Sequence, residues 1–383
     1  MPEFITLLTG IIALMNAKTD ITIAGGGIAG LLTAREFLQA GCTVTLLDKQ
    51  AIGLESSWAG GGILLPLYPW HHTPAVTQLA LASRAYYPAL AEQLHRSTGI
   101  DPEWLPCGLL MTPVEECERA LAWCTQHQLP AEIADAQRLA LFPIATPDAL
   151  WLPDVAQIRN PRLIKALQAD LLQCGARIVE FCELYGTRVQ HQRIHAIETS
   201  RGTFEIEQLV LCTGAWSGEL WQQLFSPLGP RHGHLPIHPV KGQMLLFEAT
   251  PGLLPHMVIT GDYYLIPRRD GKILAGSTVE QSGFDKTTTE EAYDALADMA
   301  QRMFPPLRDA PIIGHWAGLR PSSPQGIPYI GCHPNLNNLG INAGHFRNGL
   351  VMGPAAARLI VDLILQRPPH IDPSPYQLDA PRD

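Results

Sequence analysis

The chain has 383 residues, of which 46% are hydrophobic and 16% are charged, a composition typical of a folded protein with one or two domains. Its 27 basic and 36 acidic side chains give a formal net charge of −9 without a dense basic run, which argues against nucleic acid as a partner. The eight cysteines are scattered and form no Cys-x-x-Cys pair, so we expect free thiols and a cytoplasmic location.

Residues 1–17 are an apolar N-terminal extension. The run from Phe4 to Met15 is too short to span a bilayer, and Glu3 stands where a signal peptide carries basic residues. We therefore expect a disordered or loosely packed segment ahead of the first strand. A weak contact with a membrane is the alternative that this segment leaves open.

A nucleotide-binding fingerprint comes next in the chain. Apolar runs and periodicity predict a strand over 21–24, a helix over 28–40 and a strand over 43–47. The motif Gly25-x-Gly27-x-x-Gly30 opens the helix, and Asp48 follows the second strand. Such glycines permit a tight turn, approach of a pyrophosphate to the helix N-terminus and close helix packing, while the carboxylate binds ribose hydroxyls. The stretch predicts a dinucleotide site but does not distinguish NAD from FAD.

Residues 55–127 are predicted to form a loop followed by two helices. Residues 55–63 are small and glycine-rich, which indicates a loop whose backbone can lie against a ligand. Helices are predicted over 76–96, with a kink at Pro88, and over 114–127.

Another α/β segment follows. Asn160 is expected to cap a helix that has Pro161 in its first turn and ends at Gly175. Residues 208–214 have the pattern of a buried parallel strand that stops at a glycine turn.

From residue 220 to about 319 the pattern becomes one of alternating strands. Strands are expected over 241–247, 263–267 and 272–276, with a hairpin turn over 268–271 and one helix over 290–303. The C-terminal part returns to α/β, with a strand over 339–342 and a helix over 354–365.

Two architectures are thus interleaved, a doubly wound α/β layer and an inserted antiparallel sheet. We predict an N-terminal extension (1–17), a discontinuous nucleotide-binding domain (18–80, 148–219 and 320–366), a substrate domain (81–147 and 220–319) and a C-terminal tail (367–383).

Five segments together resemble the D-amino acid oxidase superfamily of FAD enzymes and, within it, the glycine oxidase family of thiamine biosynthesis. They are Gly25-x-Gly27-x-x-Gly30, Glu55 to Ile63, Tyr264-Leu-Ile-Pro-Arg268, Ala317-Gly-Leu-Arg-Pro321 and Ala343-Gly-His-Phe-Arg-Asn-Gly349. The resemblance covers residues 18 to 366. It implies a Rossmann-like FAD-binding domain interleaved with an antiparallel-sheet substrate domain.

The resemblance also implies roles for individual side chains. Arg320, which the sequence places in a loop, matches the arginine that clamps the substrate carboxylate, a task suited to a planar guanidinium. Tyr264 and Arg347 match two further active-site residues. Asp262 stands where the family pattern has histidine. Ile63 and Val279 match apolar pocket positions, where they would favour a small substrate.

Cofactor contacts are expected from five segments, over residues 25–30, 48–49, 56–62, 214 and 344–349. The C-terminal helix would point its positive N-terminus at the flavin. No cysteine lies near residues 319–321, where some relatives attach FAD, and Cys332 is well downstream, so we expect non-covalent FAD. The cofactor-binding residues implied are Gly25, Gly27, Ile28, Ala29, Gly30, Asp48, Lys49, Ser56, Ser57, Gly61, Gly62, Gly214, Gly344, His345, Arg347, Asn348 and Gly349.

No metal site is expected, because His232, His234 and His238 lie among prolines without a carboxylate or thiolate at ligand spacing. The function implied is oxidation of a small amino acid to its imine by hydride transfer to flavin, with dioxygen reduced to hydrogen peroxide, in a homo-oligomer. A dehydrogenase with another electron acceptor and a non-catalytic redox sensor are the alternatives.

Overall fold

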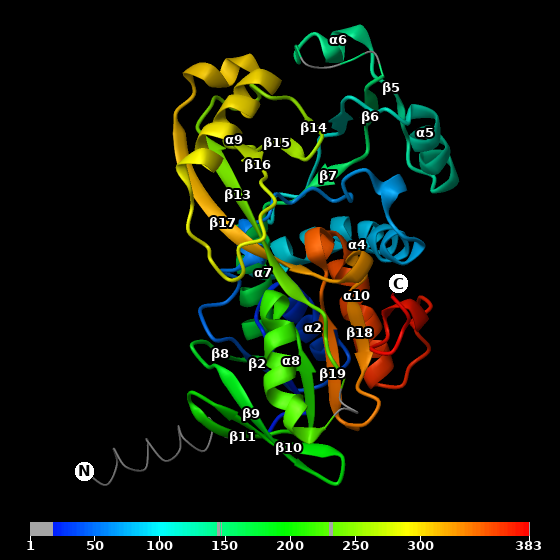
Figure 1. The fold of residues 1–383 in the computed structure, drawn as a ribbon, viewed down its shortest axis with the longest axis vertical. Coiled ribbons are helices and arrows are strands. Elements are labelled where there is room, and N and C mark those ends of the chain that lie inside the picture. Colours follow the sequence, from blue (N-terminus) through cyan, green and yellow to red (C-terminus); the bar gives the residue numbers. More distant parts are fainter. Residues whose placement is uncertain (1–17, 144–145, 147, 230–232, 383) are drawn as a thin grey trace, which may run out of the picture.

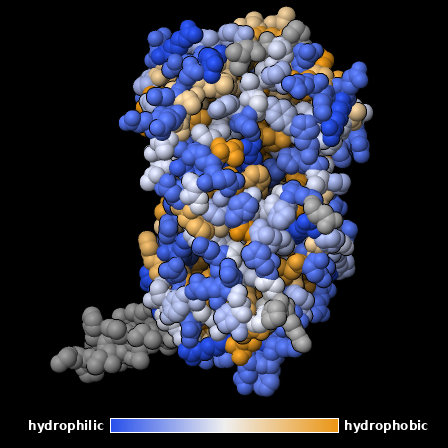
Figure 2. All heavy atoms as spheres, viewed as in Figure 1, coloured by the Kyte–Doolittle hydropathy of each residue, from blue (hydrophilic) through white to orange (hydrophobic). Residues whose placement is uncertain are grey.

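Two large sheets organise the protein, seen here in a computed structural model that describes residues 18–143, 146, 148–229 and 233–382 (Figure 1). The expected extension over residues 1–17, with its membrane contact, and His232 lie outside the described residues. In Figure 1 the antiparallel sheet fills the upper half and the parallel sheet the lower half. Hydrophilic residues cover most of the face shown in Figure 2, with apolar residues in small separate groups.

The lower sheet has six strands in the order β18-β19-β12-β1-β2-β8, with only β18 antiparallel to its neighbour. Its central strand β1 is buried along its whole length and pairs on both sides, Ile23 lying opposite Leu46 and Val210. The strand bounds are β1 Ile21–Ala24, β2 Val44–Leu47, β8 Arg177–Val179, β12 Gln208–Leu211, β18 Tyr329–Cys332 and β19 Leu339–Ala343.

Helices cover this sheet and enclose the largest apolar core. Helix α10 packs against α2 and α4, and α7 packs against both α2 and α4. Helix α8 covers β9 of a small three-stranded sheet, β11-β10-β9. The bounds are α2 Ile28–Gln39, α3 Ser56–Ala59, α4 Pro74–Thr98, α7 Asn160–Gln173, α8 Ser217–Phe225, α10 Gly349–Ile364, β9 Leu184–Gln190, β10 Arg193–Thr199 and β11 Gly202–Glu205.

The upper sheet has eight strands in the order β17-β13-β16-β15-β14-β4-β6-β5. All neighbours are antiparallel except β14 and β4, and α9 packs on β13, β15 and β16. The bounds are β4 Leu109–Met111, β5 Glu132–Ile133, β6 Leu150–Leu152, β13 His238–Phe247, β14 Met257–Thr260, β15 Tyr263–Pro267, β16 Ile273–Gly276, β17 Ile312–Ser322, α5 Cys117–Gln126, α6 Ala136–Leu139 and α9 Glu290–Met303; the pair β3 Leu105–Pro106 and β7 Ala156–Gln157 connects the layers.

The predicted fold class is confirmed, and the predicted elements are present, with changed limits. Every strand of the parallel sheet lies in the three segments assigned to nucleotide binding. However, β6 belongs to the antiparallel sheet, and β17 crosses the predicted boundary at 320. The division into domains at those residues stays a prediction.

Helix α10 begins at Gly349 and not at Pro354, because distant side chains compensate for the proline. A proline at position 354 cannot donate to the carbonyl of Leu350. The hydroxyl of Tyr87, buried on α4, donates to that carbonyl instead. The next amide, that of Ala355, donates to Ser83 Oγ at 2.9 Å. The helix therefore continues through the proline.

Asn160 does not cap α7, contrary to the sequence prediction. The N-cap is Arg159, and Asn160 is the first helical residue. The Asn160 amide nitrogen donates to the carbonyl of Ser57 at 2.9 Å. Its side chain thus holds the glycine-rich segment after β2 and does not cap the helix.

Candidate active site

A cavity of about 350 Å³ receives residues from both large sheets. Its glycine-turn end, defined by Gly25, Gly27 and Asp48, comes from the parallel layer. Its arginine end, defined by Tyr264, Arg320 and Arg347, comes from β15, β17 and the loop before α10. The predicted cofactor residues in its wall are Gly25, Gly27, Ile28, Ala29, Asp48, Lys49, Ser56, Ser57, Gly61, Gly62, Gly214, His345, Arg347, Asn348 and Gly349.

At the glycine-turn end, crowding explains why glycine is needed. Gly25 has φ +106°, and a Cβ there would lie 2.3 Å from the carbonyl oxygen of Cys212. A Cβ on Gly30 would lie 1.8 Å from the carbonyl oxygen of Gly25. Gly30 is absent from the cavity wall, so its contribution is the close packing of α2 on the turn.

The N-terminus of α2 presents donors to the cavity. The amide of Ile28 donates to Ser57 Oγ at 2.8 Å. In the described part of the chain, no group accepts from the N–H groups of Gly27, Ala29 and Gly30. Free amides at a helix N-terminus, together with the helix dipole, favour a bound anion such as a phosphate.

Asp48 lies beside this turn with its carboxylate partly satisfied. Its two oxygens accept from the amides of Gly26 at 2.7 Å and Gln50 at 2.8 Å. Burial raises the pKa of Asp48, and these two hydrogen bonds oppose that shift. A carboxylate has about four acceptor positions. Capacity therefore remains for hydroxyl donors of a ligand.

Lys49 packs against Trp216, a residue that the sequence did not single out. The Lys49 ammonium nitrogen lies 3.6 Å from the centroid of the Trp216 ring, a cation–π contact. Burial lowers the pKa of Lys49. Phe284 stacks on Trp216 with 5.5 Å between centroids. Lys49 and Trp216 both line the cavity, which gives this part of the wall an aromatic and cationic surface.

At the arginine end, Arg320 is held by three acceptors. It lies in strand β17 and not in a loop, because residues 312–322 pair with β13. Its Nη1 donates to the carbonyls of Lys241 and Thr278, both at 3.1 Å, and Nη2 donates to Ser277 Oγ at 2.8 Å. A guanidinium has five N–H groups, so two remain, the number that a bidentate carboxylate requires. Burial lowers the pKa of Arg320.

Tyr264 is buried next to two glycines that make room for its ring. A Cβ on Gly276 would lie 2.9 Å from the Tyr264 ring, and one on Gly61 would lie 3.1 Å from it. The hydroxyl is 3.8 Å from the sulfur of Met244, a weak acceptor. The ring is thus fixed while its hydroxyl keeps most of its hydrogen-bonding capacity for a ligand.

The predicted pocket positions have different fates. Ile63 is buried in the cavity wall. Val279 is 46% exposed and lies outside the wall, contrary to our expectation. The reason is local pairing: the Thr278 hydroxyl accepts from the Gln243 amide, and Glu280 exchanges backbone hydrogen bonds with Lys241, which leaves Val279 facing solvent.

Asp262 lies outside the cavity wall, where it neutralises Arg347. Arg347 Nη1 lies 2.8 Å from Asp262 Oδ1, and the Asp262 side chain is 65% exposed. Of the two arginines at this end, Arg347 is therefore paired with a carboxylate and Arg320 is not.

His345 and Gly344 lie where β19 leads into α10. Burial lowers the pKa of His345 to about 4, so the ring is neutral near pH 7. Its Nε2 lies 2.8 Å from Asn342 Oδ1, which assigns the proton to Nε2 and leaves Nδ1 as a buried acceptor without a protein partner. Gly344 is outside the cavity wall; its φ of +81° turns the chain, and its carbonyl accepts from Ser323 Oγ at 2.6 Å.

Comparison with known proteins places this geometry in a family. Residues 20–363 match the family described as FAD dependent oxidoreductase. The chain belongs to this family. It is 45% identical over 361 residues to a glycine oxidase of Pseudomonas aeruginosa, covering 93% of this chain and 97% of that protein. It is 32% identical over 360 residues to the bifunctional protein ThiO/ThiG of Synechocystis, covering 92% of this chain and 52% of that protein.

Among solved structures, the crystal structure of glycine oxidase from Geobacillus kaustophilus superposes with a TM-score of 0.85. The two proteins are 28% identical, and the match covers 94% of this chain and 98% of that one. The structural match confirms the α/β architecture with an antiparallel second layer.

The residues present fit FAD, the cofactor of the family. The glycine-turn end supplies free amides for phosphates and a carboxylate for hydroxyls, as described above. Buried acceptors without protein partners, His345 Nδ1 and Asn160 Oδ1, stand on residues of the cavity wall. The N-terminus of α10 contributes Gly349, Leu350 and Val351 to the same wall, as expected for the helix that faces the flavin.

Several residues of the FAD cavity escaped sequence analysis, because each has an ordinary structural explanation when read alone. Trp216, Met244 and Ser277 contribute to the wall, as do Asn160 and Asn342. Ser277 and Asn342 stand at the ends of predicted strands and Trp216 follows a glycine turn, whereas Met244 and Asn160 carry no such signal. No described group of three or more histidine, cysteine or acidic residues could hold a metal, and no described helix is long and apolar enough to cross a bilayer.

Proposed function

We propose that the protein is an amino acid oxidase whose substrate is glycine or another small amino acid, such as sarcosine or D-alanine. The observation that carries this proposal is Arg320: a guanidinium in the wall of an FAD cavity, with two N–H groups free for a carboxylate. The identity to glycine oxidases over nearly the whole chain supports the choice of substrate class.

The arginine end would act by binding and orientation. Arg320 holds the substrate carboxylate bidentately, and the Tyr264 hydroxyl donates a further hydrogen bond to it. Ile63, Met244 and the Tyr264 ring line the same cavity as Arg320, and their bulk would favour a substrate with a small side chain. When bound, FAD would accept the two electrons and the hydride that leave Cα, and dioxygen would reoxidise the cofactor and be reduced to hydrogen peroxide. Holding the substrate in one orientation would supply much of the rate enhancement.

The imine product would enter thiazole synthesis for thiamine, an interpretation supported by the similarity to the bifunctional protein ThiO/ThiG. We also expect a cytoplasmic homo-oligomer with non-covalently bound FAD. Release of free FAD by acid precipitation would verify the absence of a covalent bond, and light scattering would give the subunit number.

The test combines spectroscopy with oxygen consumption. Under anaerobic conditions, glycine should bleach the flavin absorbance at a saturating rate, and readmitted air should restore it with formation of hydrogen peroxide. In Arg320→Met, kcat/KM should fall by about 10³-fold, the value of two charge-assisted hydrogen bonds, with the flavin spectrum unchanged. Arg320→Lys keeps the positive charge but loses the paired N–H groups of the guanidinium. Its kcat/KM should lie between the values for the wild type and for Arg320→Met.

Bleaching without oxygen consumption would replace the oxidase with a dehydrogenase that uses another electron acceptor. A flavin that none of the three amines bleaches would overturn the proposed function altogether. Arg320→Met with unchanged turnover would remove Arg320 as the carboxylate anchor.

A further inference from the structure

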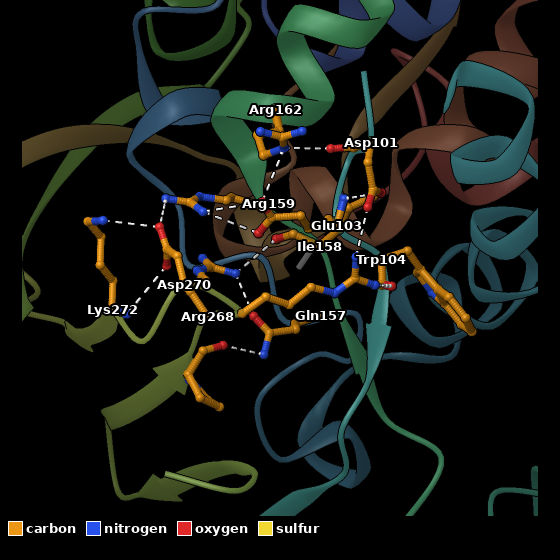
Figure 3. A network of polar contacts seen from close by, with 12 residues as sticks. Asp101, Glu103, Trp104, Gln157, Ile158, Arg159, Arg162, Arg268, Asp270 and Lys272 are labelled. Atoms are coloured by element: carbon orange, nitrogen blue, oxygen red, sulfur yellow. Dashed lines mark hydrogen bonds and ion pairs between the residues drawn. The ribbon is translucent and has the colours of Figure 1, made fainter. Parts of the chain in front are cut away.

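A buried arginine stands behind the cavity wall and takes no part in the proposed chemistry. Arg268 follows β15 and is 8% exposed. Its Nη2 donates to the carbonyl of Gly61 at 2.7 Å, and Nη1 donates to Gln157 Oε1 at 2.6 Å and to the carbonyl of Ile158 at 3.3 Å. Figure 3 shows this guanidinium at the centre of a polar network that joins segments far apart in the sequence.

The acceptors of Arg268 are all neutral, although carboxylates are near. Glu103 pairs with Arg159 and Arg162, both at 3.2 Å. Asp270 pairs with Arg159 at 3.0 Å and Lys272 at 3.1 Å (Figure 3). Three cations thus share two carboxylates, and Arg268 is a fourth cation that pairs with neither of them.

Burial, and to a lesser extent the charge of Arg159, lower the pKa of Arg268 to about 10. The side chain therefore remains charged near neutral pH. An unpaired buried charge is costly. A chain that keeps one beside a ligand cavity creates a positive potential there, which favours a ligand that carries or acquires negative charge.

The contact with Gly61 also fixes a peptide orientation. A trans peptide is planar, so its carbonyl and its N–H point in opposite directions. Because the Gly61 carbonyl points at Arg268, the N–H of Gly62 points away from it. In the described chain no group accepts from the N–H of Gly61 or Gly62. Both residues line the cavity, and Gly61 lies next to the Tyr264 ring.

Gln157 makes this arrangement rigid. It is 1% exposed, and its amide nitrogen donates to the carbonyl of Pro267 at 2.6 Å while its oxygen accepts from Arg268. Ile158, the next residue, donates its amide to the carbonyl of Gly62 at 2.9 Å. The carbonyls of Gly61 and Gly62 are thus held by Arg268 and by Ile158, the residue that follows β7.

We propose that Arg268 is a positioning residue for the cofactor: it holds the Gly61–Gly62 peptide with its N–H groups available to FAD, and its charge stabilises the reduced cofactor through that peptide. The proposal rests on FAD binding, which the family establishes, and not on glycine as the substrate.

The test compares Arg268→Met with Arg269→Met in the FAD-loaded enzyme. Arg269 is the adjacent residue, but its partners are Asp101 at 2.7 Å and the carbonyl of Trp104 at 3.0 Å, and none of these three residues lines the cavity. The readouts are the reduction potential in a dithionite titration, the flavin absorption spectrum and the flavin released on dilution. None of them requires an amine substrate, so they are informative even if glycine is not oxidised.

Arg268→Met should shift the reduction potential to more negative values, change the flavin band shape and raise the FAD dissociation constant by about tenfold or more, the value of a charged hydrogen bond. Arg268→Lys should recover part of the potential, and Arg269→Met should match the wild type. If Arg268→Met lowers only the unfolding temperature and leaves potential and spectrum unchanged, the role is structural and the proposal is wrong.

Gln157→Glu provides a second route should Arg268→Met fail to fold. It retains an oxygen acceptor for Arg268 and places a negative charge against the guanidinium, so the charge is offset while the side-chain volume is kept, although the donor to the Pro267 carbonyl is lost. A potential more negative than that of the wild type is expected. An unchanged potential would overturn the electrostatic part of the proposal.

Discussion

The two ends of the cavity are built differently. The glycine-turn end comes largely from one continuous stretch, residues 25–62, and binds through backbone amides held by crowded glycines. The arginine end is assembled from β15, β17 and the loop before α10, and its groups are the side chains of Tyr264, Arg320 and Arg347. Substitutions should therefore abolish cofactor binding at the first end, and change substrate affinity at the second.

The strongest test of this difference is Gly30→Val. A Cβ at this position would meet the Gly25 carbonyl oxygen at 1.8 Å, and neither backbone can move without opening the turn. We expect loss of more than about 4 kcal/mol of stability and of nearly all bound FAD. The ratio of flavin to protein absorbance and the unfolding temperature would measure both effects.

Gly41→Ala is the matched control, because a Cβ there would meet nothing within 4 Å. Its φ of +88° predicts a cost of about 1 kcal/mol with FAD retained. A Gly30→Val protein that carries a full complement of FAD would show that the turn tolerates side chains, and the proposed contrast would then be lost.

The same contrast explains what could be predicted from sequence. Gly25 and Gly30 can be predicted from the sequence because the local crowding of the backbone admits only glycine. Arg320 was assigned through family resemblance, since its acceptors on β13 and after β16 are distant in the chain. The start of α10 was mispredicted because a local rule about Pro354 could not anticipate the hydroxyl of Tyr87. Arg268 could not be predicted as a site residue, because its partners Gly61 and Gln157 are distant in the sequence and contact it only in the folded protein.

An effect of intermediate size is expected from the neutral His345. In an unfolded chain its pKa is about 6.5, whereas in the folded protein it is about 4. Between these values the unfolded state binds more protons than the folded state. The contribution of neutral His345 to the free energy of unfolding is therefore complete above about pH 6.5 and is lost as the pH falls toward 4. The difference amounts to about 3 kcal/mol.

Urea unfolding at several pH values would measure this contribution as the difference between wild type and His345→Gln. The stability of the variant should fall less steeply from pH 6.5 to 4. His195→Gln, at an exposed histidine of β10, is the control and should follow the wild type. Parallel curves for wild type and His345→Gln would mean that the buried imidazole is not held neutral by the fold.

The smallest effect is expected at the ion pair between Asp262 and Arg347. With the Asp262 side chain 65% exposed, the pair is worth less than about 1 kcal/mol. Asp262→Asn frees a positive charge near the arginine end, so KM for glycine should fall by less than about fivefold at low salt. In about 1 M salt, where screening acts over about 3 Å, the effect should vanish. Asp262→Glu, which keeps the charge, should change little. A change in KM of tenfold or more that does not depend on salt would instead show that this pair is as rigid a part of the site as the glycine turn. The two ends of the cavity would then not differ in kind.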